Sequence, residues 1–364
     1  MKLVIGKDAV MTGLQMVHGV VNVRPTVAVL SNVLLEARDN KLWMTTTDME
    51  VTMRCVVEAQ TSKAGATTIP ARRLFSIIRE LPADNIEIDV DDKNAASITC
   101  GASFFKINGL PDDEFPALPK NDEGHTFTMD QKILKDMLQK TFYAASTDET
   151  RFILNGTLMS FKANKLTLVA TDGRRLALTE HELEFPKETE GEAIVPTKAI
   201  NELIRILKDE GVVKIHLGKN QAHFDLDAVT LTTKLIEGTY PNFRQVIPGQ
   251  CEQRIAVERE VLLTALKRVA LLTSEKSSSI KLTFGKNKLK ISASSPDVGE
   301  AHESVAIKYT AKEIQVAFNP DYIMEPLRNL VNDEIYVELT DELSPGVIKC
   351  DVPFIYVLMP MRIS

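Results

Sequence analysis

The sequence predicts an α+β protein built of three tandem domains, each with two helices packed on antiparallel sheets. The main observation is an internal repeat. The segment "KLTLVATDGRRLALT" at 165–179 resembles "KLWMTTTDMEVTM", which begins at Lys41, and "KLKISASSPDVGEA", which begins at Lys288. The steps between these starts are 124 and 123 residues, the size of a small domain. We therefore expect one structural unit to be used three times, with limits at 1–123, 124–249 and 250–364.

Two amphipathic helices are expected in each unit. The first helices are predicted at 8–21, 131–144 and 259–272, where apolar residues recur with a period of three to four. The second helices follow a proline and are predicted at 71–81, 197–209 and 320–331. Pro70, Pro196 and Pro320 lie close to the expected helix starts, where the missing N–H of proline costs little.

The segments between the helices are expected to form strands. "NKLTLVATD", at 164–172, alternates Leu166, Leu168 and Ala170 with Lys165 and Thr167. Runs such as 212–220 and 333–341 have the same character. Alternation of this kind, bounded by Gly, Asn and Asp, indicates half-buried antiparallel strands with short connections.

The composition is that of an ordinary globular protein. The chain has 364 residues, 44% of them hydrophobic, and a net charge of −7. No apolar run approaches the roughly 20 residues of a membrane helix, and the start is too short in apolar residues for a signal peptide. The four cysteines are scattered, without a CxxC pair, so we expect reduced thiols, mostly buried. We expect a cytoplasmic protein.

Positive charge is concentrated on the predicted helices. Fourteen Lys or Arg and nine Asp or Glu lie in the six helical stretches 7–21, 71–81, 131–145, 197–209, 258–272 and 320–331, although the whole chain is acidic. Helical geometry directs Lys132, Lys135 and Lys140 away from the apolar stripe of their helix, toward solvent. These faces are either ordinary solvated helix surfaces or a surface that holds phosphates without reading bases.

The sequence lacks the usual marks of catalysis. The six histidines show no HxH or HExxH spacing, and there is no GxSxG motif or phosphate loop. Asp48 and Asp172 lie in corresponding loops, where we expect each to cap a turn through its own backbone. We therefore expect no catalytic residue, no metal and no cofactor, and do not predict an enzyme.

The whole chain resembles the bacterial DNA polymerase sliding clamps, the β subunits of the replicative polymerase holoenzyme. The resemblance is carried by "RPTVAVLSNVLLE" (24–36), "TIPARRLF" (68–75), "RFILNGTL" (151–158), "VATDGRRLA" (169–177), "YPNFRQVIP" (240–248) and "YVLMPMRIS" (356–364). It implies three DNA-clamp domains per chain and two chains closing head to tail into a six-domain ring. It also implies a processivity factor that encircles duplex DNA without sequence preference. The implied partners are a second copy of the chain, the replicative polymerase, the clamp loader and other proteins carrying short clamp-binding peptides.

The resemblance also implies functional positions in three groups. The pocket for partner peptides would comprise Leu154, Thr171, Gly173, Arg174, Arg175, Leu176, Pro241, Val246, Val357, Met359, Pro360, Met361 and Arg362. Arg24 and Arg72 match positions that contact DNA, and the charged helix faces add Arg73, Lys198 and Arg205. The dimer interface would use Arg73, Phe105, Ile107, Leu271, Leu272, Glu300 and Glu303, with the apolar members exposed in the monomer.

The chain departs from the family pattern at three positions within the segments that carry the resemblance. Arg174 stands where family members often have His, which adds charge at the rim of the pocket. Phe152 and Ile153 stand where two tyrosines are common near DNA, so we do not expect these two residues to contact DNA. Two other hypotheses remain at this point: an enzyme acting on DNA or nucleotides, and a monomeric peptide-binding module.

Overall fold

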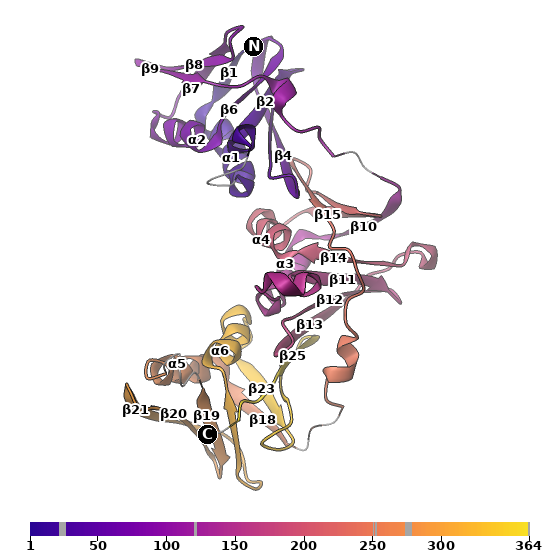
Figure 1. Cartoon of the computed structure of the whole chain (residues 1–364), viewed down its shortest axis with the longest axis vertical. Coiled ribbons are helices and arrows are strands. Elements are labelled where there is room, and N and C mark those ends of the chain that lie inside the picture. The colour runs from indigo at the N-terminus through magenta and orange to yellow at the C-terminus, as the bar shows by residue number, and fades with distance from the viewer. Residues whose placement is uncertain (22–26, 120–121, 250, 252, 274–278, 363–364) are drawn as a thin grey trace. The chain divides into compact units, whose positions relative to one another are not determined.

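The computed structural model describes residues 1–21, 27–119, 122–249, 251, 253–273 and 279–362. The chain forms two compact units (Figure 1). The first comprises Met1–Lys135 and Lys198–Leu235, and the second comprises Asp136–Thr197 and Ile236–Ser364. Each unit holds one eight-stranded sheet and one smaller sheet, all with antiparallel pairing.

The first unit combines strands of the first two predicted domains. Its helices are α1 (Lys7–Val17), α2 (Ala71–Glu80) and α4 (Thr197–Ile206), and α3 (Gln131–Gln139) starts in it. The larger sheet has the order β10 (Gly124–Asp130), β15 (Val212–Gly218), β16 (Gln221–Asp225), β17 (Val229–Lys234), β4 (Val51–Glu58), β3 (Lys41–Thr47), β2 (Asn32–Arg38) and β6 (Gly65–Pro70). The smaller has β5 (Gln60–Lys63), β1 (Lys2–Gly6), β7 (Asn85–Val90), β8 (Ala95–Cys100) and β9 (Ser103–Asn108).

The second unit repeats this construction. Its helices include α5 (Arg259–Ala270) and α6 (Pro320–Asn329). The larger sheet has the order β14 (Gly191–Pro196), β11 (Gly156–Lys162), β12 (Lys165–Thr171), β13 (Arg175–Glu182), β25 (Phe354–Leu358), β24 (Gly346–Lys349), β23 (Glu334–Leu339) and β18 (Gln253–Glu258). The smaller has β21 (Gly299–Ala306), β20 (Lys288–Ser295), β19 (Ile280–Gly285) and β22 (Ile314–Phe318).

Short 3-10 helices complete the described secondary structure. They are η1 (His18–Val20), η2 (Ala28–Ser31), η3 (Asp112–Glu114), η4 (Phe142–Ala144), η5 (Glu149–Leu154), η6 (Lys187–Thr189) and η7 (Phe243–Val246). The six predicted helices are all confirmed, although each ends one to five residues earlier than predicted. Within the described ranges, no helix is long and apolar enough to cross a membrane.

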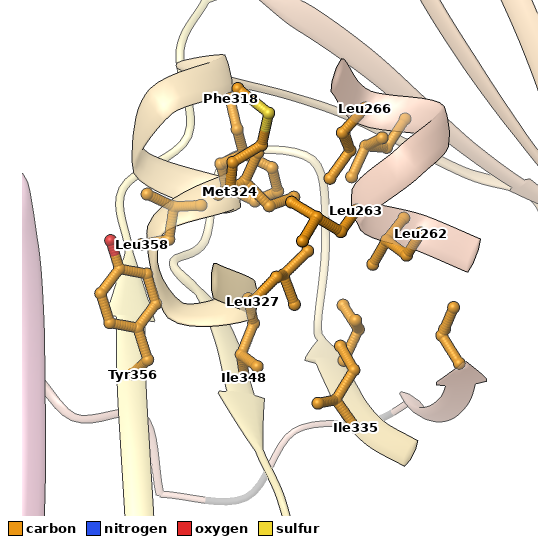
Figure 2. Close-up of a cluster of buried hydrophobic side chains, with 14 of the residues drawn as sticks. Leu262, Leu263, Leu266, Phe318, Met324, Leu327, Ile335, Ile348, Tyr356 and Leu358 are labelled. Atoms are coloured by element: carbon orange, nitrogen blue, oxygen red, sulfur yellow. The ribbon is translucent and has the colours of Figure 1, made fainter. Parts of the chain in front are cut away.

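The core of the second unit shows why the amphipathic pattern folds this way (Figure 2). Leu263 and Leu266 of α5 pack with Met324 and Leu327 of α6 against the strands that carry Ile335, Ile348, Tyr356 and Leu358. Each fully buried Leu or Met contributes roughly 1.5–3 kcal/mol. The helix α6 starts where predicted, with Pro320 in its first turn and the Asn319 side chain accepting hydrogen bonds from the N–H groups of Asp321 and Tyr322.

Two expectations about side chains had different outcomes. The cysteines are free, with Cys55, Cys100 and Cys350 buried, as predicted. The prediction that Lys140 points to solvent was wrong, because its side chain is only 7% exposed. Its backbone N–H donates to the carbonyl of Asp136 at 3.1 Å, as in a helix, and its ammonium pairs with the Asp136 carboxylate at 2.5 Å.

Candidate functional site

The residues predicted to form the peptide pocket lie within the second unit, and strand pairing brings most of them together. β13 pairs with β25 so that Leu176 faces Val357. Beyond the strand, the N–H of Met359 donates to the carbonyl of Arg174 at 3.0 Å. The N–H of Met361 donates to the carbonyl of Ala317 at 2.7 Å. The C-terminal segment is thus fixed beside the turn that joins β12 and β13.

An apolar cluster forms the floor of this region. Leu176 and Val357, each 2% exposed, pack with Leu178 and Tyr240, and Leu154 covers the cluster from the end of η5. Val246 and Met359 remain 50% and 44% exposed. Exposed apolar side chains beside a buried apolar cluster offer area that a ligand's aliphatic or aromatic side chains can cover.

The turn between β12 and β13 has a fixed shape. The Asp172 carboxylate accepts hydrogen bonds from the N–H groups of Arg174 and Arg175, at 2.8 and 3.0 Å. Gly173 has a φ of +82°, a conformation that favours glycine. Asp48 accepts from the N–H groups of Glu50 and Val51 in the same way, so the predicted capping role of both aspartates is confirmed.

Arg174 and Arg175 are neighbours in sequence but have different surroundings. Arg174 is exposed, whereas the Arg175 side chain is 9% exposed. The Arg175 guanidinium pairs with Asp172 at 3.1 Å and with Glu325 of α6 at 3.5 Å, and it lies 4.3 Å from the centre of the Tyr322 ring. Its Nη2 donates to the carbonyl of Tyr143 at 2.6 Å. Arg175 therefore joins α6 to the β12–β13 turn and has little surface to offer a ligand.

The remaining predicted pocket residues lie at the edge of this region. Pro360 and Met361 are half-buried, and Pro241 and Arg362 are exposed. Ile153 packs on the apolar cluster, whereas Phe152 is 57% exposed. The predicted set missed Phe243 and Ile247, which also pack on the cluster. Both belong to the "YPNFRQVIP" segment, whose apolar residues were a usable signal.

The predicted basic residues of the first unit are arranged unequally. Arg72 and Arg73 of α2 are both exposed, whereas Lys198 of α4 forms an ion pair with Asp48. Arg24 lies outside the described residues. The basic residues with direct access to solvent on α2 therefore have the most freedom to meet an external anion.

Arg205 of α4 is held within the first unit. It pairs with Glu202 at 2.5 Å and donates to the carbonyls of Gln15 and Met16, both at 2.5 Å. These carbonyls belong to the last turn of α1, where helical acceptors have no partner in the helix and a cation is favourable. Arg205 thus connects a helix of the first predicted domain to a helix of the second.

Comparison with known proteins decides the family. The N-terminal, central and C-terminal domain models of the DNA polymerase III beta subunit match residues 1–119, 128–242 and 244–362. The chain belongs to this family. The beta sliding clamp of Chlamydia muridarum is 35% identical over all of this chain and 99% of its own length. That of Pseudomonas putida is 33% identical over the whole of both chains.

Solved clamps have the same fold. A sliding clamp of Pseudomonas aeruginosa bound to griselimycin matches with a TM-score of 0.95 and 33% identity over the whole of both chains. A Bacillus subtilis clamp matches with a TM-score of 0.94 and 28% identity over the same extent. The protein is thus a sliding clamp for DNA polymerase, a non-catalytic processivity factor of three tandem clamp domains.

The residues predicted for the clamp's dimer interface lie on two edge strands and just after α5, apart from Arg73, which lies on α2. Phe105 on β9 is 38% exposed and Leu271, just after α5, is 75% exposed, whereas Leu272 is half-buried. The expectation that Ile107 is exposed was wrong: it is 5% exposed, although Phe105, two residues earlier and on the same face of β9, is 38% exposed. Phe104, 62% exposed on the same strand, was missed, although the Phe-Phe pair was visible in the sequence.

The acidic residues of β21 complete this group. Glu300 is exposed, whereas Glu303 already pairs with Arg268 of α5 in the same chain. Among the described residues, no group of three His, Cys, Asp or Glu side chains is placed to hold a metal ion.

Proposed function

We propose that two copies of this clamp close head to tail into a ring around duplex DNA, and that each copy carries partner proteins through the pocket of the second unit. In this proposal the three domains are 1–123, 124–249 and 250–364. The partners are the replicative polymerase, the clamp loader and other proteins with short clamp-binding peptides. We place this activity in the cytoplasm.

The observation that carries the peptide proposal is the apolar cluster that includes Val357 and is covered by Ile247, because the exposed Met359 and Val246 stand close to these two residues in the chain. Two apolar anchors of an extended peptide can cover these side chains and the edge of Leu154. Pro241 and Pro360 limit the conformations of the flanking segments, which lowers the ordering cost of binding. Methionine at 359 can adapt to different partners. A short peptide buries little area, so we expect affinity on the order of micromolar.

The proposal of ring closure is supported by free strand edges. β9 is the last strand of its sheet, and β21 is the last strand of another. Such edges present unpaired N–H and C=O groups, which favour pairing with another chain. Exposed apolar side chains at Phe104, Phe105 and Leu271 would be covered in such a pairing. A head-to-tail contact uses two different surfaces and closes when the rotation per copy permits it.

The proposal of sequence-independent DNA contact is supported by the exposed guanidinium groups of Arg72 and Arg73. Arg24 belongs to the same proposed set. Lys198 and Arg205 contribute less, since each already forms an ion pair with a carboxylate of the chain that offsets its charge. Contacts of this kind bind phosphates and carry no base information.

The peptide proposal is tested by fluorescence anisotropy with a labelled peptide that contains a Gln-Leu-x-Leu-Phe-like run. Val246→Ser combined with Met359→Ser should weaken binding about tenfold or more, because few anchors carry most of the energy of such an interface. Val331→Ser with Leu343→Ser is the matched control, since these apolar residues of the same unit are 81% and 80% exposed and lie outside the proposed pocket. Equal affinity of both variants and the wild type would place the peptide site elsewhere.

The ring is tested by retention on DNA. A protein held by topology should stay on a closed circle and be lost when the circle is cut, whereas an enzyme or a monomeric peptide-binding module should not distinguish the two. Light scattering on the same sample gives the oligomeric state. A monomer that is retained equally on circular and linear DNA would overturn the ring.

A further inference from the structure

One face of the eight-stranded sheet in the first unit carries a pocket of about 470 Å³, a volume typical of small-molecule sites. Most of its lining is polar. The cross-strand register places these side chains in two rows on the same face of the sheet. One row is His216, His223, Thr232 and Thr52, and the other is Lys214, Asp225, Thr230 and Arg54. We name this the polar sheet pocket.

The repeat shows how unusual this polarity is. Thr52 of β4 corresponds to Leu176 of β13, 124 residues later, and Thr232 of β17 corresponds to Val357 of β25. The pairing is equivalent, since Thr232 faces Thr52 as Val357 faces Leu176. In the same way Arg54 corresponds to Leu178. Positions that form the apolar floor of the proposed peptide pocket are therefore hydroxyl and guanidinium groups here, so this pocket suits a polar ligand.

Two buried polar atoms at the pocket have no hydrogen-bond partner among the described residues. His223 is 5% exposed, and its Nδ1 is 2.8 Å from the hydroxyl oxygen of Thr232, but its Nε2 has no partner. The Nε of Arg54 also has none. Because buried polar atoms are nearly always satisfied in folded proteins, these two atoms indicate where a polar group of a bound molecule would be stabilised.

Arg54 is held in a fixed orientation. Its guanidinium lies 4.5 Å from the centre of the Trp43 ring, and its Nη2 donates to Glu36 at 2.8 Å. The side chain is still 26% exposed, so part of the guanidinium faces the pocket. A preoriented guanidinium loses little entropy when it binds a carboxylate or phosphate.

A second cation lies at the rim. Lys214 of β15 is exposed, and no ion pair involving it occurs in the described part of the chain. Asp225 is also exposed and lies directly opposite Lys214 in the register. Its carboxylate repels an anion, which favours a position for the anion on the Arg54 side of the pocket.

We propose that the polar sheet pocket binds a small ligand that carries an oxyanion, either a phosphate or a carboxylate. Arg54 binds the oxyanion, Lys214, three strands away at the rim, attracts it through its charge, and a polar atom of the ligand lies near His223. This site is separate from the proposed peptide pocket and does not depend on it, because all its residues belong to the first unit.

Ligand binding can be followed by the fluorescence of the protein's own tryptophan. Trp43 is the only tryptophan, and it lines the pocket. The full-length protein is titrated with inorganic phosphate and, separately, with succinate, at ionic strength held constant with chloride, while tryptophan fluorescence is recorded. A saturable change with at least one probe is expected. Saturation by phosphate alone identifies a phosphate site, and saturation by succinate alone identifies a carboxylate site.

Variants tie the signal to the pocket. Arg54→Gln should raise the Kd about tenfold or more, because a charge-assisted hydrogen bond is lost. Lys214→Ala, an exposed position, should raise it severalfold. The matched control is Arg254→Gln, since Arg254 lies 4.1 Å from the Tyr336 ring and pairs with Glu338 at 3.9 Å in the second unit. It should leave the Kd unchanged.

Two results would overturn the proposal. One is the absence of a saturable change with either probe. The other is a Kd that is unchanged in Arg54→Gln and Lys214→Ala alike. If Arg54→Gln fails to fold, as judged by loss of a cooperative thermal transition, the exposed Lys214→Ala variant decides the outcome alone.

Discussion

Replacing Arg175 by Met should destabilise the second unit strongly, although Arg175 was predicted from the sequence as a residue of the peptide pocket. Met keeps most of the aliphatic volume and removes the charge. The change leaves Asp172, 13% exposed, and Glu325, 28% exposed, without their shared cation. It also removes the hydrogen bond to the carbonyl of Tyr143.

The expected magnitude follows from burial. Removing one partner of a buried ion pair costs about 3–5 kcal/mol, and the partial exposure of Glu325 favours the lower limit. A loss of about 3 kcal/mol should lower the melting temperature of a unit of this size by about 6–12 °C. Calorimetry measures the melting temperature of each variant, with Arg174→Met as the control. Arg174 is adjacent and exposed, so its replacement should change the stability by less than about 0.5 kcal/mol.

The pH dependence gives an independent check. Burial raises the pKa of Glu325 above its ordinary value of 4.5, and the charge of Arg175 opposes this rise. Without Arg175 the pKa should rise further, so the folded variant binds a proton that the unfolded chain does not yet bind. Protonation then favours the folded state. The stability gap to the wild type should narrow as the pH falls toward 4.5, and Arg175→Met with Glu325→Gln should recover part of the loss at pH 7. Equal stability of Arg174→Met and Arg175→Met at neutral pH would refute the reasoning.

Two further predictions concern DNA and assembly. Arg72→Ala with Arg73→Ala should weaken retention on DNA about equally for all sequences and reduce the log–log salt slope by roughly one unit per lost phosphate contact; an unchanged slope would mean that α2 does not meet DNA. Leu271→Ala with Leu272→Ala should yield monomers in sedimentation experiments, because it removes exposed apolar area at the proposed interface; an intact dimer at micromolar concentration would contradict that assignment.

The repeat and its periodicity predicted most of the fold, because each helix and strand is locally consistent with its place in the unit. The predictions were wrong for side chains whose burial is set by tertiary contacts. Lys140 keeps the helical backbone hydrogen bond to Asp136, but its side chain is buried in an ion pair with the same residue, which the apolar stripe does not reveal. Phe105 and Ile107 point to the same face of β9, yet Phe105 is exposed and Ile107 is buried. The alternation of the strand does not predict this difference.

The candidate site was predicted in a similar way. Leu176 and Val357 could be identified from the motifs, and their pairing across β13 and β25 agrees with a common pocket. The role of Arg175 could not be predicted, because its partner Glu325 lies 150 positions later and no local pattern connects them. The polar sheet pocket could not be predicted from the sequence either, since most of its lining comes from six paired strands.

Deleting residues 360–364 should abolish peptide binding and leave the fold, the dimer and the retention on circular DNA intact. The physical reason is that the described part of this segment adds little to the core. Pro360 and Met361 are half-buried, and Arg362 is exposed. In the described residues, the segment pairs with a strand only through the bridge between Met361 and Ala317 of β22, in the four-stranded sheet.

The strand that precedes the deletion should hold its place. Val357 is buried in the apolar cluster and β25 is paired on both sides, with β13 and with β24. The deletion removes one backbone bridge to β22, which costs about 1 kcal/mol and leaves the pairing of β25 unchanged. Anisotropy with the labelled peptide, run beside the retention assay and a thermal melt, separates the outcomes. Unchanged peptide affinity would mean that the terminal segment is no wall of the pocket. Loss of the cooperative melt would mean that its contacts with β22 are part of the core, and that the two roles cannot be separated by truncation.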